Sequence, residues 1–115
     1  MSIANGIPIV PETLRTVAFG GIGAAYSELG DPFDNAIRLI SFKNFTNETL
    51  TFSFDGVNDH EILLENSAII LDLTSNSSNH FFPVIRAGTQ IWVKATGALP
   101  ASGAAYMSAY RTVGD

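Results

Sequence analysis

Cysteine is absent from this chain of 115 residues. Disulfide-stabilised scaffolds, thiolate metal sites and cysteine nucleophiles are therefore excluded. Positive charge is also scarce, because 6 Lys and Arg stand against 11 Asp and Glu and the formal net charge is −5. A protein that binds nucleic-acid phosphates needs a cluster of basic residues, and here the basic residues are scattered along the sequence. We therefore expect no nucleic-acid partner.

Long hydrophobic runs are missing as well. No apolar stretch approaches the roughly 20 residues that a membrane-spanning helix requires. The N-terminal sequence MSIANGIPIVPE lacks the basic region and the apolar run of a secretory signal. The sequence therefore predicts synthesis in a cytoplasm and no membrane partner.

Charged residues make up only 15% of the chain, while hydrophobic residues make up 46% and include 8 Phe. Soluble domains typically carry about 25% charged residues. The length fits one domain of ordinary size, and the apolar content is enough for a hydrophobic core. The low charge indicates either a surface partly covered by partners or a β-sandwich surface built from Thr, Ser and Asn.

The central part of the chain carries the clearest strand signals. In residues 49–54, large apolar side chains alternate strictly with Thr and Ser, which predicts a strand with one face in the core and one in water. Residues 37–45 are apolar on both faces, as in a strand well inside a sandwich. The short linker between these two segments predicts that they form an antiparallel hairpin.

Further short strands are predicted on both sides of this centre, with turn signals roughly every 8–12 residues. This spacing favours an all-β fold: a single β-sandwich, jelly-roll or immunoglobulin-like, of about 7–8 short antiparallel strands over residues 14–115. The flanking strands are expected at residues 14–19, with 22–29 as a second strand or its continuation, and at residues 62–64, 68–73, 80–85, 90–95 and 104–113.

Residues 1–13 are predicted to form an extended N-terminal arm, because two prolines in this stretch favour extended backbone. The arm is either a frayed terminus or a segment that lies on a neighbouring subunit. In the second case Ile7, Ile9 and Val10 are the expected contacts. Additional interface candidates are Val57 and Asn58 in a loop, and Tyr106 and Tyr110, which share one face of the last predicted strand.

Motifs that would carry chemistry are weak. The segment FGGIG at residues 19–23 has Tyr26 where a dinucleotide fingerprint has its third glycine, and it reads as a bend. The acidic loop at residues 55–61 does not match the spacing of a calcium loop, and Asp and Asn are ordinary turn residues. No serine lies in a nucleophile elbow. We therefore expect no catalytic residue, no metal site and no cofactor.

Two other functions remain open on the residues. Tyr26, Trp92, Tyr106 and Tyr110 could form a platform for sugars, as in a carbohydrate- or receptor-binding module, or could pack in the core or at an interface. A small metal-dependent enzyme would have to use His60 and His80, the only histidines, together with Asp59.

One ordered set of segments runs through nearly the whole chain. It consists of VPETLRTVAFGGIGAAYSELG, then Arg38-Leu39-Ile40 and Asn44, FDGVNDH at residues 54–60, Leu71-Asp72-Leu73, Phe81-Phe82, AGTQIWVK at residues 87–94 and GAAY at residues 103–106. In this order the segments resemble small all-β virion proteins of tailed bacteriophages.

The resemblance implies a non-enzymatic structural role in the virion, as a head decoration, neck or tail component. The partners that it implies are other virion proteins and copies of the chain itself, in a homo-oligomer within the particle. Extended arms and sheet edges are the elements that join neighbours in such assemblies.

Overall fold

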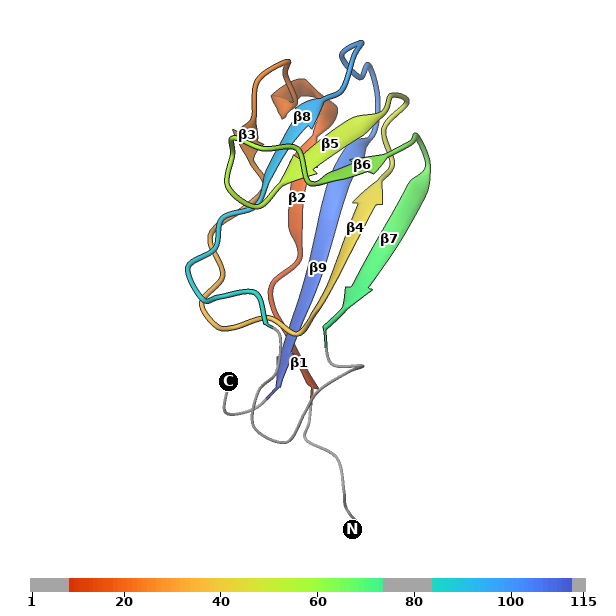
Figure 1. Ribbon diagram of the computed structural model, residues 1–115. Helices are drawn as coiled ribbons and strands as arrows, with labels where there is room; N and C mark the ends of the chain where they lie inside the picture. The colour runs from red at the N-terminus through yellow and green to blue at the C-terminus, as the bar shows by residue number, and fades with distance from the viewer. Residues whose placement is uncertain (1–8, 74–83, 113–115) are drawn as a thin grey trace.

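The computed structural model describes residues 9–73 and 84–112, and these residues are almost entirely β (Figure 1). The only helical element among them is one turn of 3-10 helix, Phe19–Gly21, at the predicted glycine bend. The strands are β1 Ile9–Pro11, β2 Arg15–Ala18, β3 Ser27–Glu28, β4 Leu39–Asn44, β5 Leu50–Ser53, β6 Glu61–Leu63, β7 Ser67–Asp72, β8 Trp92–Ala95 and β9 Ala104–Thr112.

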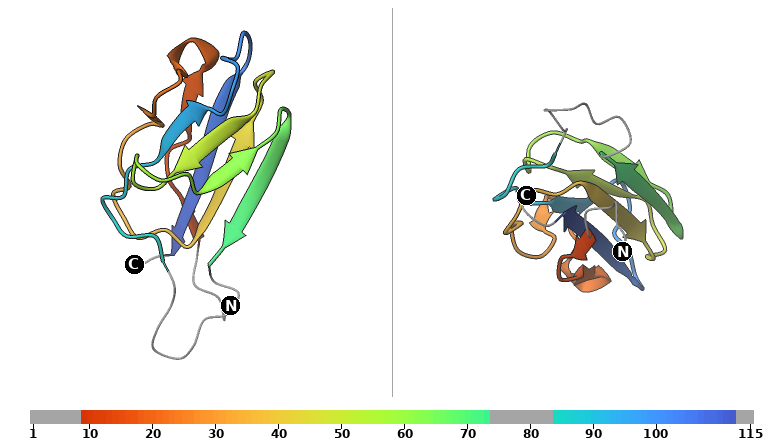
Figure 2. Two further views of the ribbon diagram at one scale, coloured as in Figure 1. Left: turned by 45° about the horizontal axis from the view of Figure 1, so that its top comes forward. Right: turned by 90° about the horizontal axis from the view of Figure 1, so that it is seen from below.

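The strands form two antiparallel sheets that pack face to face (Figures 1 and 2). In the first sheet the order is β1-β9-β4-β7. β2 also pairs with β9, at a different part of that strand from β1. In the second sheet the order is β3-β8-β5-β6. The single predicted β-sandwich is therefore confirmed.

The strand order also distinguishes between the two predicted sandwich types. β1 and β2 both pair with β9 and act as one interrupted strand. From there the chain changes sheet at every connection except the one between β5 and β6. Two four-stranded sheets linked in this way form a jelly roll.

The core lies between the sheets and is rich in Phe. The rings of Phe42 on β4 and Phe52 on β5 face each other across the sandwich, with centroids 5.0 Å apart. β9 contributes Ala105, Met107 and Ala109, which are buried, while the residues between them are only half-buried. Tyr106 and Tyr110 therefore share the outer face of β9, as the alternation predicted.

The predicted hairpin between residues 37–45 and 49–54 is wrong. β4 pairs with β7 and β9, whereas β5 pairs with β6 and β8, so the two strands belong to opposite sheets. Side chains in the connection supply the hydrogen bonds that let it cross the sandwich. Asn44 Nδ2 donates to Glu48 O (2.8 Å), and the Thr46 N–H donates to Asn44 Oδ1 (2.9 Å).

The prediction that one face of residues 49–54 meets water is also wrong. Thr51 is 1% exposed and Ser53 is 0% exposed, although both point away from the core. Their hydroxyl groups are hydrogen-bonded: Thr51 Oγ1 lies 2.7 Å from Thr96 Oγ1, and Ser53 Oγ donates to Asp55 Oδ1 (2.9 Å). The loop after β5 folds back onto Ser53, whose Oγ accepts the N–H groups of Asp55 (3.2 Å) and Gly56 (2.9 Å).

The described end of the predicted arm is part of the first sheet. Residues 9–11 are extended as expected, but they form β1 and pair with β9 of the same chain. Val10 is half-buried there, and Glu12 continues the pairing because its N–H donates to Ala109 O (2.8 Å). Ile7 and the rest of residues 1–8 lie outside the described residues. Residues 9–12 therefore belong to the first sheet.

Two flanking strands differ from their predictions. In the predicted strand 22–29 only Ser27–Glu28 pair, with β8. In the predicted strand 80–85, residues 80–83 lie outside the described residues, and Ile85 forms an isolated bridge with Ile37. Within the described part of the chain, no helix has the length and apolar character needed to cross a membrane.

Candidate functional site: the loop surface over the second sheet

The loop that follows β5 is organised by Asp55. Its Oδ1 accepts the N–H groups of Val57 and Asn58, both at 2.8 Å, and its Oδ2 accepts the side-chain amide of Asn58 (2.9 Å). The Gly56 N–H donates to Ser53 Oγ (2.9 Å). Asp and Ser commonly accept backbone hydrogen bonds in this way in tight turns. The acidic residue thus shapes the loop, as its turn chemistry predicted.

The loop lies directly on the only tryptophan. Gly56 has φ +77°, and a Cβ atom at this position would lie 2.8 Å from Trp92 Cε2. Only glycine combines this backbone conformation with such a close approach to the ring. The close contact fixes the loop against the outer face of β8.

Tyr26, Asp59 and Lys94 form a polar cluster beside this contact. The Tyr26 hydroxyl donates to Asp59 Oδ1, and Lys94 Nζ lies 3.2 Å from the same oxygen. Lys94 Nζ also sits 4.6 Å from the centroid of the Tyr26 ring, within cation–π range. We call Tyr26, Trp92, Lys94 and residues 55–60 the loop surface.

Hydrogen bonds shift the pKa values of three groups in the loop surface. The pKa of Asp55 is lowered by hydrogen bonds from the Asn58 and Val57 N–H groups and from the Asn58 side chain. The pKa of Asp59 is lowered by the hydrogen bond from Tyr26 and by Lys94. Burial, followed by the hydrogen bond to Asp59, raises the pKa of Tyr26 to about 12. All three groups therefore keep their ordinary charge at neutral pH, and none is prepared to transfer a proton there.

The shifted acidity of Tyr26 gives a direct test of the cluster. In an alkaline titration followed by tyrosinate absorbance, we expect a late step near pH 12 that Tyr26→Phe removes. Because the folded-state pKa is raised, the phenol's contribution to stability is complete below its ordinary pKa and is lost as pH rises through the folded-state value. Asp59→Asn should move the late step to lower pH, and a late step that persists in Tyr26→Phe would contradict the assignment.

The predicted interface residues fall in different places. Val57 is 78% exposed at the tip of the loop surface, and Asn58 is exposed beside it. Tyr106 and Tyr110 lie on the outer face of the first sheet, and Tyr106 packs against Phe45 with ring centroids 5.7 Å apart. The four aromatic residues considered as one sugar platform therefore divide between opposite faces of the sandwich.

Among the described residues there is one histidine, His60, and it lies in the loop surface. His60 Nδ1 accepts the N–H of Phe54 (3.0 Å), so it helps to close the loop. His80 lies outside the described residues. Within the described ranges, no group of three or more His, Asp and Glu side chains is placed to hold a metal ion.

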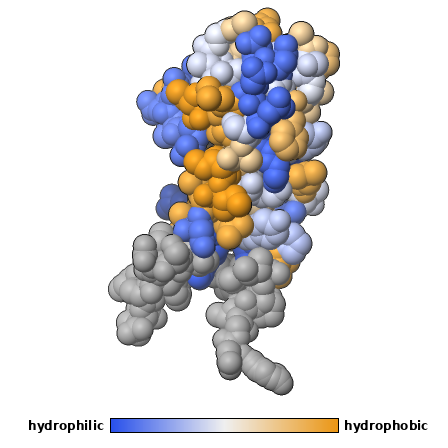
Figure 3. Space-filling view, turned by 90° about the vertical axis from the view of Figure 1, so that its right-hand side faces the viewer, coloured by the Kyte–Doolittle hydropathy of each residue, from blue (hydrophilic) through white to orange (hydrophobic). Residues whose placement is uncertain are grey.

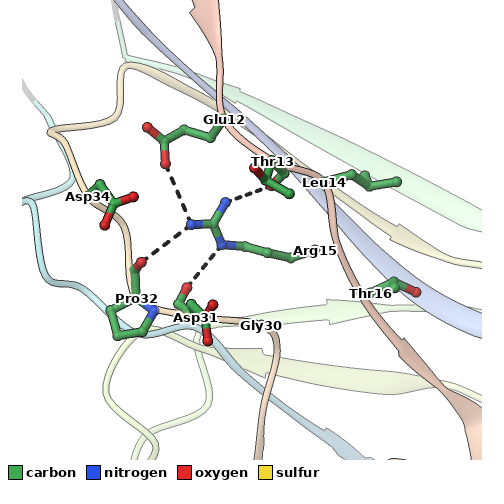
Figure 4. A pocket seen from close by; sticks show the side chains of 9 residues that line it. All are labelled: Glu12, Thr13, Leu14, Arg15, Thr16, Gly30, Asp31, Pro32 and Asp34. Atoms are coloured by element: carbon green, nitrogen blue, oxygen red, sulfur yellow. Dashed lines mark hydrogen bonds and ion pairs between the residues drawn. The ribbon is translucent and has the colours of Figure 1, made fainter.

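A pocket of about 360 Å³ opens beside β2, and the guanidinium group of Arg15 lies among its lining residues (Figure 4). Arg15 is only 7% exposed, and its guanidinium group donates to Thr13 O (2.7 Å) and Asp31 O (3.0 Å). It also pairs with Glu12 (3.5 Å) and lies 4.7 Å from the centroid of the Phe33 ring. These contacts connect residues 12–15 to the loop before β4. The guanidinium group therefore has a structural role.

Sequence reasoning missed an apolar surface on the side of the sandwich where β6 and β7 end the two sheets. Ile62 is 60% exposed, Leu64 66% and Ile70 65%. Figure 3 shows hydrophobic side chains gathered along this side of the molecule. Residues 68–73 were predicted only as a strand, and it is the strand order that places β7 at the edge of its sheet.

No protein-family model, no curated protein and no solved structure matches the chain.

Proposed function

We propose that this chain is a non-enzymatic structural protein of a tailed-bacteriophage virion, and that it assembles through protein–protein contacts. The observation that carries the proposal is the apolar side of the sandwich, where Ile62, Leu64 and Ile70 are each at least 60% exposed. Exposed apolar side chains that gather on one side of a molecule, as in Figure 3, commonly mark a protein interface. The jelly roll supports the same proposal, because it is an architecture of viral capsid domains.

The scarcity of charged residues in β7 is consistent with an interface on this side. Large aliphatic side chains in the centre of a contact, with charged residues kept to its rim, are typical of assembling surfaces. Here β7 carries a single charged residue, Asp72, at its end. The low overall charge of the chain is then explained by a surface that partners cover in the particle.

The carbohydrate-binding alternative has one favourable observation, which is that Tyr26 and Trp92 share the loop surface with polar loop residues. Jelly rolls also include lectin domains. However, Gly56 already lies against the Trp92 ring and Lys94 against the Tyr26 ring, so these contacts compete with stacked sugars. We therefore rank this function second.

The proposal is tested on purified particles of the phage whose genome encodes the sequence. We expect the chain to co-sediment with intact virions, and quantitative mass spectrometry should find it there in a fixed ratio to the major head or tail proteins. A variant lacking residues 1–8 leaves β1 and Glu12 in place, so loss of incorporation in that variant would assign the contact to the predicted arm. A chain found only in the soluble fraction of the lysate would contradict the proposal.

A further inference from the structure

The outer face of the first sheet is centred on β4, which lies between β9 and β7 (Figure 1). Ile40 and Phe42 face the core and are fully buried, so Ser41 and Lys43 lie on the outer face. The register places Ser108 of β9 opposite Ser41. Two small hydroxyl side chains therefore lie side by side near the middle of this face.

The side chain of Lys43 extends along β4 to this pair of serines. Its Nζ donates to Ser41 Oγ and to Ser108 Oγ, both at 3.2 Å. Lys43 is half-buried, and Ser41 is only 6% exposed although it faces outward. An ammonium group has three N–H donors, so one of them has no partner among the described residues. The two hydrogen bonds hold the positive charge over the serines.

The charge of Lys43 is not paired with a carboxylate in the described part of the chain. Three other basic side chains are paired: Arg15 and Arg111 with Glu12, and Lys94 with Asp59. Asp72 shares the outer face with Lys43 and is engaged elsewhere. Withdrawing an ammonium group partly from water costs free energy unless an anion compensates for the lost hydration. A half-buried positive charge at this position therefore favours a partner that brings a carboxylate.

Two tyrosines lie on either side of this charge. Tyr106 lies opposite Lys43, and Tyr110 follows Ser108 on the same face of β9. Both tyrosines are half-buried, and their hydroxyl groups make no hydrogen bond with the described residues. Tyrosine offers a large contact area at a low cost in conformational entropy, together with a hydroxyl group that can donate. The ammonium group thus lies between two residues suited to a protein contact.

We propose that the outer face of the first sheet binds a partner protein through an Asp or Glu side chain that pairs with Lys43 between Tyr106 and Tyr110. The carboxylate completes the hydrogen bonding of the ammonium group and can also accept from the tyrosine hydroxyl groups. Ile70, which is 65% exposed, lies opposite Ser41, so this surface continues into the apolar side of the sandwich. The inference deepens the proposed function and rests on it, because it names the surface of the assembly contact and the chemistry of the partner.

Incorporation into virions tests the role of the charge. Lys43→Met keeps an unbranched side chain and removes the ammonium group, so we expect at least about tenfold less of this variant than of the wild type in purified particles. Lys43→Arg keeps the charge and should restore part of the incorporation. Arg86→Met removes an exposed positive charge elsewhere and should be incorporated as the wild type is. Normal incorporation of Lys43→Met, or an equal loss in Arg86→Met, would overturn the inference and leave the proposed function standing.

Binding of model peptides to the full chain tests the site without the particle. The probes are tetraglutamate and tetraglutamine peptides with blocked ends, and binding is followed by the NMR signals of Lys43, Tyr106 and Tyr110. The formal net charge of −5 repels an acidic peptide at long range, so saturable binding identifies a local site. We expect tetraglutamate to bind at least about tenfold more tightly than tetraglutamine, and Lys43→Met to abolish the difference.

The outcomes of the peptide experiment separate this inference from the proposed function. Equal affinities of the two peptides, no binding of tetraglutamate at millimolar concentration, or binding of a polyglucuronate in its place would overturn the protein partner at Lys43. A chain that binds tetraglutamate at Lys43 but is absent from virions would contradict only the proposed function.

Discussion

Replacing Gly103 by alanine is expected to lower the free energy of unfolding by about 3 kcal/mol or more, one of the largest effects of any single methyl group in this chain. Gly103 has φ +85°, a conformation that disfavours every residue with a Cβ atom. An added Cβ would also lie 2.0 Å from Phe45 O and 2.9 Å from the Thr46 Cα. Both contacts are with backbone atoms, so no side-chain rotation relieves them.

Neighbouring hydrogen bonds prevent the two segments from moving apart. Gly103 O accepts the N–H of Phe19 (3.0 Å), and the Phe45 N–H donates to Ala104 O (3.0 Å). Urea denaturation followed by the fluorescence of the single tryptophan measures the effect. Gly97→Ala is the matched control, because no heavy atom lies within 4 Å of the added Cβ and its φ is not positive. Equal stability of the two variants would contradict the close approach at Gly103.

Asn44→Ala is expected to cost about 4 kcal/mol of stability, because it removes all the hydrogen bonds that a fully buried amide makes with two other segments of the chain. Asn44 is fully buried, and its amide Nδ2 donates to Glu48 O (2.8 Å), Leu63 O (2.9 Å) and Leu64 O (3.2 Å). Its Oδ1 accepts the N–H (2.9 Å) and the hydroxyl (2.7 Å) of Thr46. One side chain thus connects the crossing after β4 with the end of β6.

A second substitution distinguishes the hydrogen bonds that the Asn44 amide donates from those that its Oδ1 accepts. Asn44→Asp keeps the acceptor for Thr46 but places a carboxylate against carbonyl oxygens, so its loss should be at least as large as that of Asn44→Ala. Asn47→Ala serves as the control, since Asn47 is exposed and accepts one hydrogen bond, from the Ala101 N–H (2.8 Å). We expect it to lose about 1 kcal/mol. A loss at Asn47 that matches the loss at Asn44 in urea denaturation would contradict the role of the buried amide.

Strand positions and the faces of some strands could be predicted from the sequence, because both depend on local alternation. Tyr106 and Tyr110 fall on one face of β9, as a period of two residues requires. The same alternation misled at β5, where Thr51 and Ser53 are buried with their hydroxyl groups hydrogen-bonded. Hydroxyl groups with hydrogen-bond partners tolerate burial, so a polar residue in a strand does not by itself indicate contact with water.

The pairing of strands was the part that local patterns could not supply. A three-residue linker fits both a hairpin and a crossing between sheets, and here the side chains of Asn44 and Thr46 stabilise the crossing. The position of β7 at the edge of its sheet could not be predicted either, because the same apolar sequence is compatible with a central strand and with an edge strand. The covered face of Trp92 depends on Gly56, which is distant in sequence and is brought there by the loop.

The position of β9 has a consequence for how the protein is made. The first sheet is assembled around this strand, since β1, β2 and β4 all pair with it, and Ile9 lies opposite Thr112. A ribosome must therefore add residues 104–112 before the earliest strands gain their partner. Until then one edge of β4 and the apolar face of the first sheet stay open, and such intermediates are prone to aggregate. Synthesis rate and chaperone supply, more than native stability, should then govern how much folded protein a cell obtains.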